Sequence, residues 1–274
     1  MKLMDILSPN PRPYWHVDAK WVFGILLFFA LITTLLLSTL IKLTDENNGP
    51  KLAAIAIGSL FIREDTIENE EAIRAEIRKQ GGAIRPIPFM PKVVITEADL
   101  ELSLNDIKIK VFQPLTTEMY QNGIEATAAK YAPDEESRKK FINDAFAFRI
   151  LTKKSHEALV SQFNMLVIVC LVLLAGFIYF SAGWGRLANP GLLLLAVSLP
   201  GSLLALLVAN PPKDGDGGPL AFLPPALAQE FGLILGQTYQ PVAIWGLVLL
   251  AAALIGKIVT SVIAKSKPKK TGKA

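Results

Sequence analysis

The chain contains four long runs of apolar residues, separated by segments in which charged and polar residues are frequent. The runs cover residues 21–41, 164–184, 191–209 and 242–264. A bilayer core about 30 Å thick requires roughly 20 apolar residues in a helix that rises about 1.5 Å per residue. We therefore expect four transmembrane helices, in which Lys257 is the one basic or acidic residue.

The first run favours a retained signal anchor over a cleaved signal peptide. Its apolar core is longer than that of a signal peptide, and no small-residue cleavage pattern follows it. Short segments rich in Lys and Arg stay on the cytoplasmic side of a membrane. The basic tail 265–274 therefore predicts a cytoplasmic C-terminus, and four spans place the N-terminal segment 1–20 and the link 185–190 on the same side.

The basic tail also predicts a contact with lipid. Its lysines are expected to lie close to anionic headgroups, and those proposed for this contact are Lys265, Lys267, Lys269 and Lys270. The formal net charge of the chain is +4. We attribute this charge to membrane orientation, since the segment from Leu43 to Phe163 holds 16 Lys or Arg against 19 Asp or Glu. No nucleic-acid partner is expected.

This orientation exports two segments, residues 42–163 and residues 210–241. We expect the first to form a mainly helical extracytoplasmic domain, which is large enough to bury a small core of its own. The predicted fold class is an all-α polytopic membrane protein with this domain inserted between the first and second transmembrane helices. The predicted location is the cell membrane of a prokaryote, with both termini in the cytoplasm.

The spacing of apolar residues in segment 94–115, VITEADLELSLNDIKIKVFQPL, fits both a strand and a helix. Two alternating apolar runs on either side of Asn105-Asp106 predict a β-hairpin. Apolar residues that recur at spacings of four and three predict a helix instead. Periodicity alone therefore does not decide between the two structures.

Charge order and capping favour the helix. Thr96 and Asp99 have the spacing of a capping pair, and acidic residues precede basic ones, as a helix dipole favours. Asp106 and Lys110 are spaced for contact on one face. The β-branched residues of IKIKV argue for a strand. We expect a helix over residues 96–112.

The apolar stretch Leu52–Ile62 begins another predicted helix, which starts near Pro50 and ends at Gly81-Gly82. Burial in the centre of the domain explains this stretch most simply. The alternative is that it lies on the bilayer or against a partner, because an exposed helix rarely needs so much apolar surface.

The second exported segment, 210–241, begins as a Pro/Gly-rich turn and becomes apolar. It is too short to span the membrane, so an interfacial or re-entrant helix is expected after Pro225. Asp214 and Asp216 have the spacing of the first ligands of an EF-hand calcium loop. Pro225 occupies the position of the closing Glu in such a loop, so a turn is the better interpretation.

Small residues predict close helix packing in the last two spans. They recur every four positions and let neighbouring helices approach. Pro200 predicts a kink in the third span, and without a polar pore lining beside it a static bend is favoured over a gate. The packing residues are Gly201, Ala205 and Ala209 in the third span, and Ala252 and Gly256 in the fourth.

Composition agrees with a membrane protein and offers little chemistry. Hydrophobic residues make up 51% of the 274 residues. One cysteine cannot form an internal disulfide. The sequence lacks the common zinc, phosphate-loop, nucleophile and dinucleotide motifs. His156-Glu157 has no partner at metal-ligand spacing and is interpreted as a helix-surface pair. We therefore expect no catalytic residue, no cofactor and no metal.

Three functional classes remain open. The preferred one is a non-enzymatic membrane protein whose exported domain binds a protein partner, or a second copy, and assembles a complex. A channel or transport component is the second, since it would use the Pro200 kink and the apolar exported segment. The third is an intramembrane or lipid-handling enzyme that uses His156, Glu157 or carboxylates near the membrane interface.

The predicted orientation is testable at Ser137, within the exported domain. A cysteine introduced there is expected to react with a membrane-impermeant maleimide added to intact cells. The unsubstituted chain is the control, because its one cysteine lies within a predicted span. Labelling that requires lysis of the cells would reverse the whole orientation.

Overall fold

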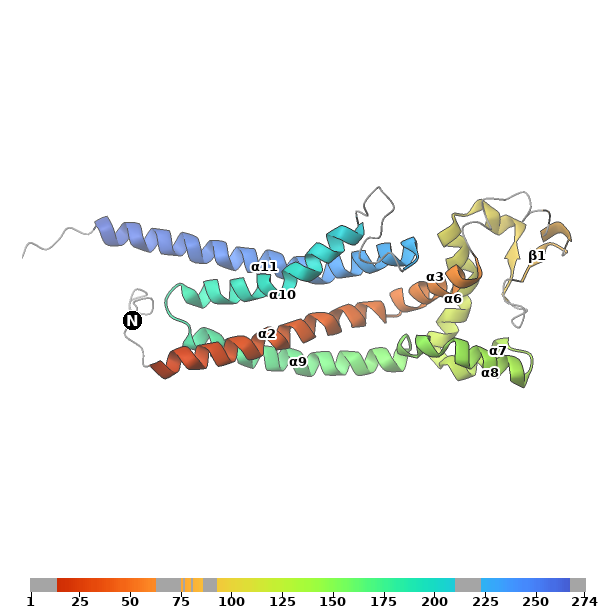
Figure 1. Ribbon diagram of the computed structural model, residues 1–274, viewed down its shortest axis with the longest axis horizontal. Coiled ribbons are helices and arrows are strands. Elements are labelled where there is room, and N and C mark those ends of the chain that lie inside the picture. Colours follow the sequence, from red (N-terminus) through yellow and green to blue (C-terminus); the bar gives the residue numbers. More distant parts are fainter. Residues whose placement is uncertain are drawn as a thin grey trace, which may run out of the picture. The chain divides into compact units, whose positions relative to one another are not determined.

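The computed structural model of the chain describes residues 14–62, 75, 77–79, 81–85, 93–209 and 223–266. These residues are largely helical (Figure 1). The chain divides into two compact units, which are described separately. Residues 1–38, 163–206 and 235–274 form the four-helix unit, and residues 39–162 and 207–234 form the helical domain.

Four helices are long and apolar enough to cross a membrane by length and composition. They are α2 (Tyr14–Leu43), α9 (Lys153–Phe180), α10 (Gly185–Ala209) and α11 (Pro225–Ser266). Each contains most or all of one predicted apolar run. Four candidate spans are therefore found in the part of the chain that the structure describes, as an all-α multi-pass membrane protein requires.

The connection between α9 and α10 is shorter than predicted. Because α9 ends at Phe180, Trp184 lies in the turn rather than in the second span. The link expected at residues 185–190 is helical, since α10 already begins at Gly185. Gly183 adopts a φ of +51°, a left-handed conformation that glycine tolerates best, and this permits the tight turn.

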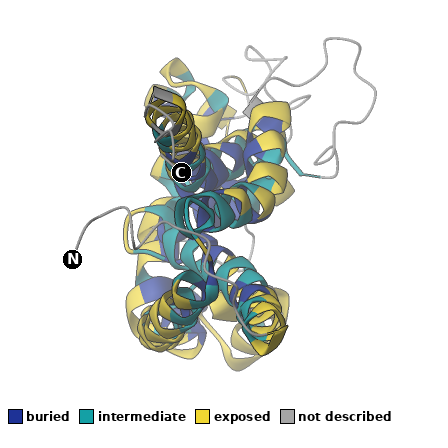
Figure 2. Ribbon diagram, turned by 90° about the vertical axis from the view of Figure 1, so that its left-hand side faces the viewer, coloured by how far each residue is buried: buried dark blue, intermediate teal, exposed yellow. Residues whose placement is uncertain are grey.

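Apolar side chains cover much of the outer surface of the four-helix unit. Phe29, Leu171, Trp245 and Ile255 are each about 60% exposed. Figure 2 shows such exposed residues in yellow on the outward faces of the helices and buried residues in dark blue between them. Helices with such a surface are suited to the hydrocarbon layer of a membrane, where the exposure of apolar side chains carries no free-energy penalty.

Helix α11 corrects the prediction for residues 210–241. It begins at Pro225, where a separate interfacial helix was expected, but it continues without a break to Ser266. Pro241 lies inside it and does not end it. Long apolar helices tolerate proline because neighbouring groups compensate for the missing N–H. Asp214 and Asp216, which suggested a calcium loop, lie outside the described residues.

The helical domain is built from short helices and a minimal sheet. Strand β1 (Ala83–Ile84) pairs antiparallel with β2 (Ile95–Thr96), with Ala83 opposite Thr96. The α-helices are α3 (Asn48–Phe61), α6 (Leu104–Asn122), α7 (Ile124–Tyr131) and α8 (Glu135–Asp144). Two 3₁₀-helices, η1 (Glu97–Glu101) and η2 (Phe146–Ile150), complete the described part of the domain.

The apolar stretch at residues 52–62 forms the centre of the domain. Helix α3 buries Ala54, Ile55 and Ile57 and packs against α6. Phe112 and Leu115 of α6 are almost completely buried in the same core. The interpretation of this stretch as a core helix is therefore confirmed, although Leu60 at its end is 71% exposed.

Helices α3 and α6 approach most closely at Gly58. A Cβ at this position would lie 2.7 Å from the Cβ of Lys108, so no larger residue fits without movement. The Lys108 ammonium, 4% exposed as a residue, donates to the Ser59 hydroxyl at 3.1 Å. Thr116 donates to the Pro50 carbonyl at 2.7 Å and fixes the other end of the helix pair.

The prediction of a helix over residues 96–112 is confirmed in type and corrected in extent. The hairpin alternative is wrong, because Asn105 and Asp106 lie in the first turn of α6. Thr96 and Asp99 form the predicted capping box, but it caps η1. The backbone is extended at Leu102 and Ser103, and α6 then begins, with Ser103 as its N-cap.

Helix α6 continues through Pro114 to Asn122, whereas the local preference of proline predicts a break here and a separate short helix that ends at Asn122-Gly123. Burial of α6 against α3 on both sides of Pro114 keeps the helix intact, at the cost of one backbone hydrogen bond. Lys110 forms its ion pair with Asp99, at 2.6 Å, instead of with Asp106 one turn away.

The helix predicted from Pro50 to Gly81-Gly82 is not continuous, because α3 ends at Phe61 and Ile62 is extended, but its predicted end at the two glycines is confirmed. The Gly82 N–H donates to the Ile77 carbonyl at 2.8 Å, and both glycines have positive φ, 81° and 98°. This is the usual use of glycine after the last turn of a helix. Residues 63–74 of the predicted helix and most of the proline-rich connector after it lie outside the described residues.

Asp99 is predicted to make the stability of the domain dependent on pH. Burial acts to raise the pKa of its carboxyl group, but hydrogen bonds from Lys110 and Thr96 outweigh burial and hold the pKa below its ordinary value. Asp99 therefore contributes stability above its unfolded pKa, and this contribution is lost as the pH falls through the folded pKa.

We expect Asp99→Asn to lower the thermal midpoint of the detergent-purified chain at neutral pH, and the difference from wild type to shrink as the pH falls below about 4, the ordinary pKa of an aspartate. Circular dichroism melts at several pH values would measure it. The exposed Asp144 provides the control, Asp144→Asn, for which little change is expected. A difference that stays constant with pH would contradict the role of the charged carboxylate.

Candidate functional site

In the four-helix unit, α2 packs against α9 through glycines and aromatic rings. A Cβ at Gly24 would lie 2.9 Å from the Phe177 ring, and a Cβ at Gly176 would lie 2.9 Å from Cζ of Phe23. Each glycine thus makes room for a phenylalanine of the opposite helix. Leu27, Cys170 and Phe177 form the buried cluster between these helices, and Leu193 of α10 packs against it.

Helices α10 and α11 approach each other so closely at Gly191 and Gly246 that their backbones are in contact. A Cβ at Gly191 would lie 2.9 Å from the carbonyl oxygen of Gly246, and a Cβ at Gly246 would lie 2.9 Å from that of Gly191. Sequence reasoning missed both residues, because neither belongs to a repeat of small residues at four-residue spacing.

Two of the predicted packing glycines lie against aromatic rings. A Cβ at Gly201 would lie 2.6 Å from Cε1 of Tyr239 on α11. A Cβ at Gly256 would lie 2.6 Å from Cε3 of Trp184, whose indole N–H donates to the Thr260 hydroxyl at 3.1 Å. At both glycines, a ring from a neighbouring segment thus occupies the space that a side chain would need.

The other predicted packing positions differ in their surroundings. Ala205 is buried, with 3% exposure. Ala252 is exposed and its neighbour Ala253 is buried, so the buried small residue at this turn of α11 is Ala253. The side chain of Ala209 lies outside the described residues. Helix α10 runs continuously through Pro200, which is exposed, and a kink there stays a prediction.

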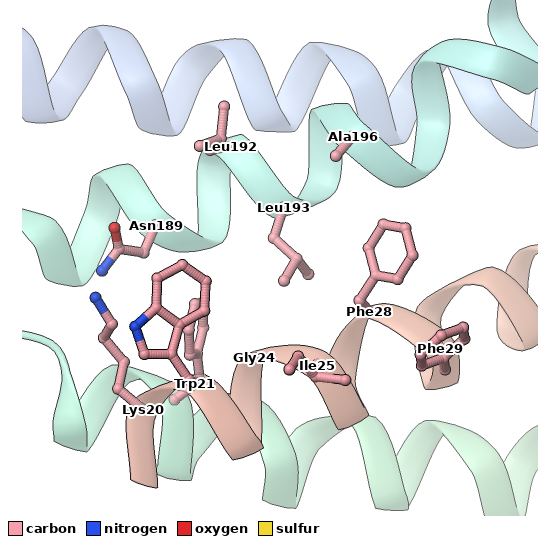
Figure 3. Close-up of a pocket in the computed structure, with 11 residues that line it drawn as sticks. Lys20, Trp21, Gly24, Ile25, Phe28, Phe29, Asn189, Leu192, Leu193 and Ala196 are labelled. Carbon is pink, nitrogen blue, oxygen red and sulfur yellow. The ribbon is translucent and has the colours of Figure 1, made fainter. Parts of the chain in front are cut away.

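An apolar pocket of about 470 Å³ lies between α2 and α10, with Phe177 of α9 in its wall. Figure 3 shows Phe28 and Leu193 pointing into it from opposite helices. Lys20 and Asn189 lie at one end of the pocket, where their side chains extend toward each other. The lining residues also include Trp21, Gly24, Ile25, Phe29, Leu192 and Ala196.

Hydrogen bonds hold the polar end of this pocket in place. Asn189 Nδ2 donates to Oγ of Ser181 at 3.1 Å, and Ser181 Oγ donates to the Phe177 carbonyl at 2.8 Å. Arg186 Nε donates to the Ser181 carbonyl at 3.2 Å. The Lys20 ammonium lies 5.2 Å from the centre of the Trp21 ring, in cation–π contact.

The helical domain carries a second candidate site on η2. Phe146 and Ile150 are 62% and 51% exposed, and the Arg149 guanidinium lies 4.9 Å from the centre of the Phe146 ring. Arg149 also donates to Glu125 at 2.8 Å. Phe146, Arg149 and Ile150 are called the η2 anchor. The pattern of residues 132–151 predicts a single helix with Phe148 and Ile150 on its apolar side, whereas α8 ends at Asp144 and Ile150 is exposed on η2.

The two histidines lie in packed surroundings. His156 Nδ1 is 3.2 Å from the Thr44 hydroxyl, so the predicted helix-surface residue has a hydrogen-bond partner. The His16 ring contacts Trp15 in a tilted arrangement and Phe180 edge-on, and its buried Nδ1 has no hydrogen-bond partner among the described residues. In the described ranges no three His, Cys, Asp or Glu residues gather as a metal site would require.

Of the tail lysines expected to contact lipid, Lys265 lies in the last turn of α11. Lys267, Lys269 and Lys270 lie outside the described residues. Thr33, Thr34 and Ser198 donate to backbone carbonyls of their own helices, as expected for hydroxyl groups in apolar helices.

Comparisons with known protein families, with curated proteins and with solved structures find no match to this chain. Its class, a largely helical protein whose described residues include four helices long and apolar enough to cross a membrane, therefore follows from its own residues.

The contact between Gly201 and Tyr239 predicts a difference between two glycines. Gly201→Ala is expected to destabilise the protein by about 1–3 kcal/mol, because the added methyl group overlaps the ring. Gly236→Ala is the matched control, since its nearest neighbour would lie at 3.4 Å and alanine favours a helix. Thermal unfolding in detergent measures both, and equal midpoints would contradict this packing.

Proposed function

We propose that the protein is a non-enzymatic integral membrane protein whose helical domain lies outside the cytoplasm and binds a protein partner to assemble a complex. The exposed η2 anchor is the observation that supports this proposal. The proposed location is a prokaryotic plasma membrane, with the first helix as a signal anchor. The basic tail and the basic N-terminal segment support a cytoplasmic location of both termini.

The side chains of the η2 anchor are those that contribute most to protein interfaces. Aromatic residues and arginine are enriched at interface centres, whereas most other contacts contribute little. Phe146 and Arg149 are three residues apart and share a face of a 3₁₀-helix, in which three residues make a turn. A suitable partner offers an apolar pocket for the ring and a carboxylate for the guanidinium.

The surrounding residues hold the anchor ready for binding. Phe148, in the middle of η2, packs against the domain core, which turns Phe146 outward. The hydroxyls of Thr152 and Ser155 both donate to the Arg149 carbonyl, at 3.1 and 3.2 Å. Little conformational entropy is then lost when a partner binds, and this favours affinity.

The proposal predicts that partners recovered with the full-length chain depend on Phe146. Affinity purification from native membranes in mild detergent is expected to recover a partner in stoichiometric amount. Phe146→Ser should weaken binding about thirtyfold, as expected for a central interface residue worth about 2 kcal/mol. Arg149→Ala should weaken it in the same direction, while Arg138→Ala on the neighbouring helix α8, also exposed, serves as its matched control.

Recovery of the chain only as a monomer would contradict the proposal, as would an undiminished yield of partner with Phe146→Ser. Thermal unfolding of each variant separates the loss of a contact from the loss of the fold. Phe146 is largely exposed, so its replacement should leave the unfolding midpoint close to that of wild type.

A further inference from the structure

The pocket between α2 and α10 is polar at one end and apolar along the rest of its length. Lys20 and Asn189 form the polar end, and the remaining lining residues are apolar or aromatic. From Lys20 to Phe29 the wall follows nine residues of helix, or roughly 14 Å. This pattern matches an amphipathic ligand that has one polar group and an extended hydrocarbon chain.

The polar end lies where a bilayer places its headgroups. Lys20 directly precedes the apolar run 21–41, and Trp21 lines the pocket beside it. Tryptophan and lysine at the end of a transmembrane run favour the interfacial layer, where a lysine extends its ammonium toward lipid phosphates. The apolar part of the pocket then extends into the hydrocarbon layer.

The charge of this end selects the ligand. The Lys20 ammonium and the Asn189 amide are hydrogen-bond donors. One Asn189 N–H is directed to Ser181 Oγ, which leaves the second free to bind an acceptor. A cation and an amide at the headgroup level favour an anionic phosphate, because hydrogen bonds to a charged acceptor are stronger than neutral ones.

We infer that this pocket binds one anionic phospholipid of the surrounding bilayer, with its phosphate at Lys20 and Asn189 and an acyl chain between α2 and α10. Trp21 and Phe28 contact that chain from α2, and Leu193 and Ala196 contact it from α10. This site belongs to the four-helix unit and does not depend on the partner proposed for the helical domain.

Native mass spectrometry of the detergent-purified full chain tests the site, with phosphatidylglycerol and phosphatidylcholine as probes. We expect the first phosphatidylglycerol to bind more tightly than the first phosphatidylcholine. Lys20→Gln should weaken phosphatidylglycerol binding about fivefold, the effect of one lysine at an anionic lipid surface, and should leave phosphatidylcholine binding unchanged. Lys257→Gln on α11, which is exposed and outside the pocket, is the matched control and should change neither.

A second variant tests the hydrocarbon part of the pocket. Ala196 is exposed on α10, so Ala196→Phe should fill the groove without disturbing the helix contacts, and its unfolding midpoint checks this. It should reduce binding of the first phosphatidylglycerol. Equal binding of the two lipids by wild type, or unchanged binding in both variants, would overturn the inference. A dimer that Ala196→Phe dissociates would overturn it too, because a second copy would then occupy the groove.

Discussion

Close contact between glycines and large rings is the interaction on which the four-helix unit depends. In a bilayer, apolar side chains gain little by leaving lipid for protein, so helices associate chiefly through good packing. Four contacts have the same form, in which a ring of one segment fills the space above a glycine of another. These pairs are Gly24–Phe177, Gly176–Phe23, Gly201–Tyr239 and Gly256–Trp184. Together they connect α2 with α9, α10 with α11, and α11 with the turn before α10.

The helical domain is stabilised differently, since it buries its apolar residues as a water-soluble protein does. Helix α3 is apolar on nearly every side because α6 and its neighbours surround it. The polar groups that the domain does bury have partners: Lys108 bonds to Ser59, Thr116 to the Pro50 carbonyl, and Asp99 to Lys110. The remaining exposed apolar side chains, of which the η2 anchor is the clearest group, are therefore available for contacts outside the domain.

Sequence reasoning succeeded where one strong physical signal acts alone. Long apolar runs indicated all four long helices, and the Thr96–Asp99 spacing indicated a real capping box. It failed where local and tertiary effects compete. Pro114 and Pro241 are helix breakers by local preference, but packing around them outweighs one missing hydrogen bond. The pocket could not be foreseen, because it joins residues near 20 to residues near 190 and no local pattern connects them.

The hydrogen bonds around Ser181 bear on how the chain enters a membrane during synthesis. Ser181 is completely buried, and its hydroxyl and carbonyl bind partners from within residues 177–189. Both groups of Ser181 are thus satisfied within the α9–α10 hairpin, while the Trp184 indole in the same turn bonds to Thr260 of α11. The hydrogen bonds of Ser181 can therefore form as soon as α9 and α10 have been made, and the Trp184 indole gains its partner when α11 follows.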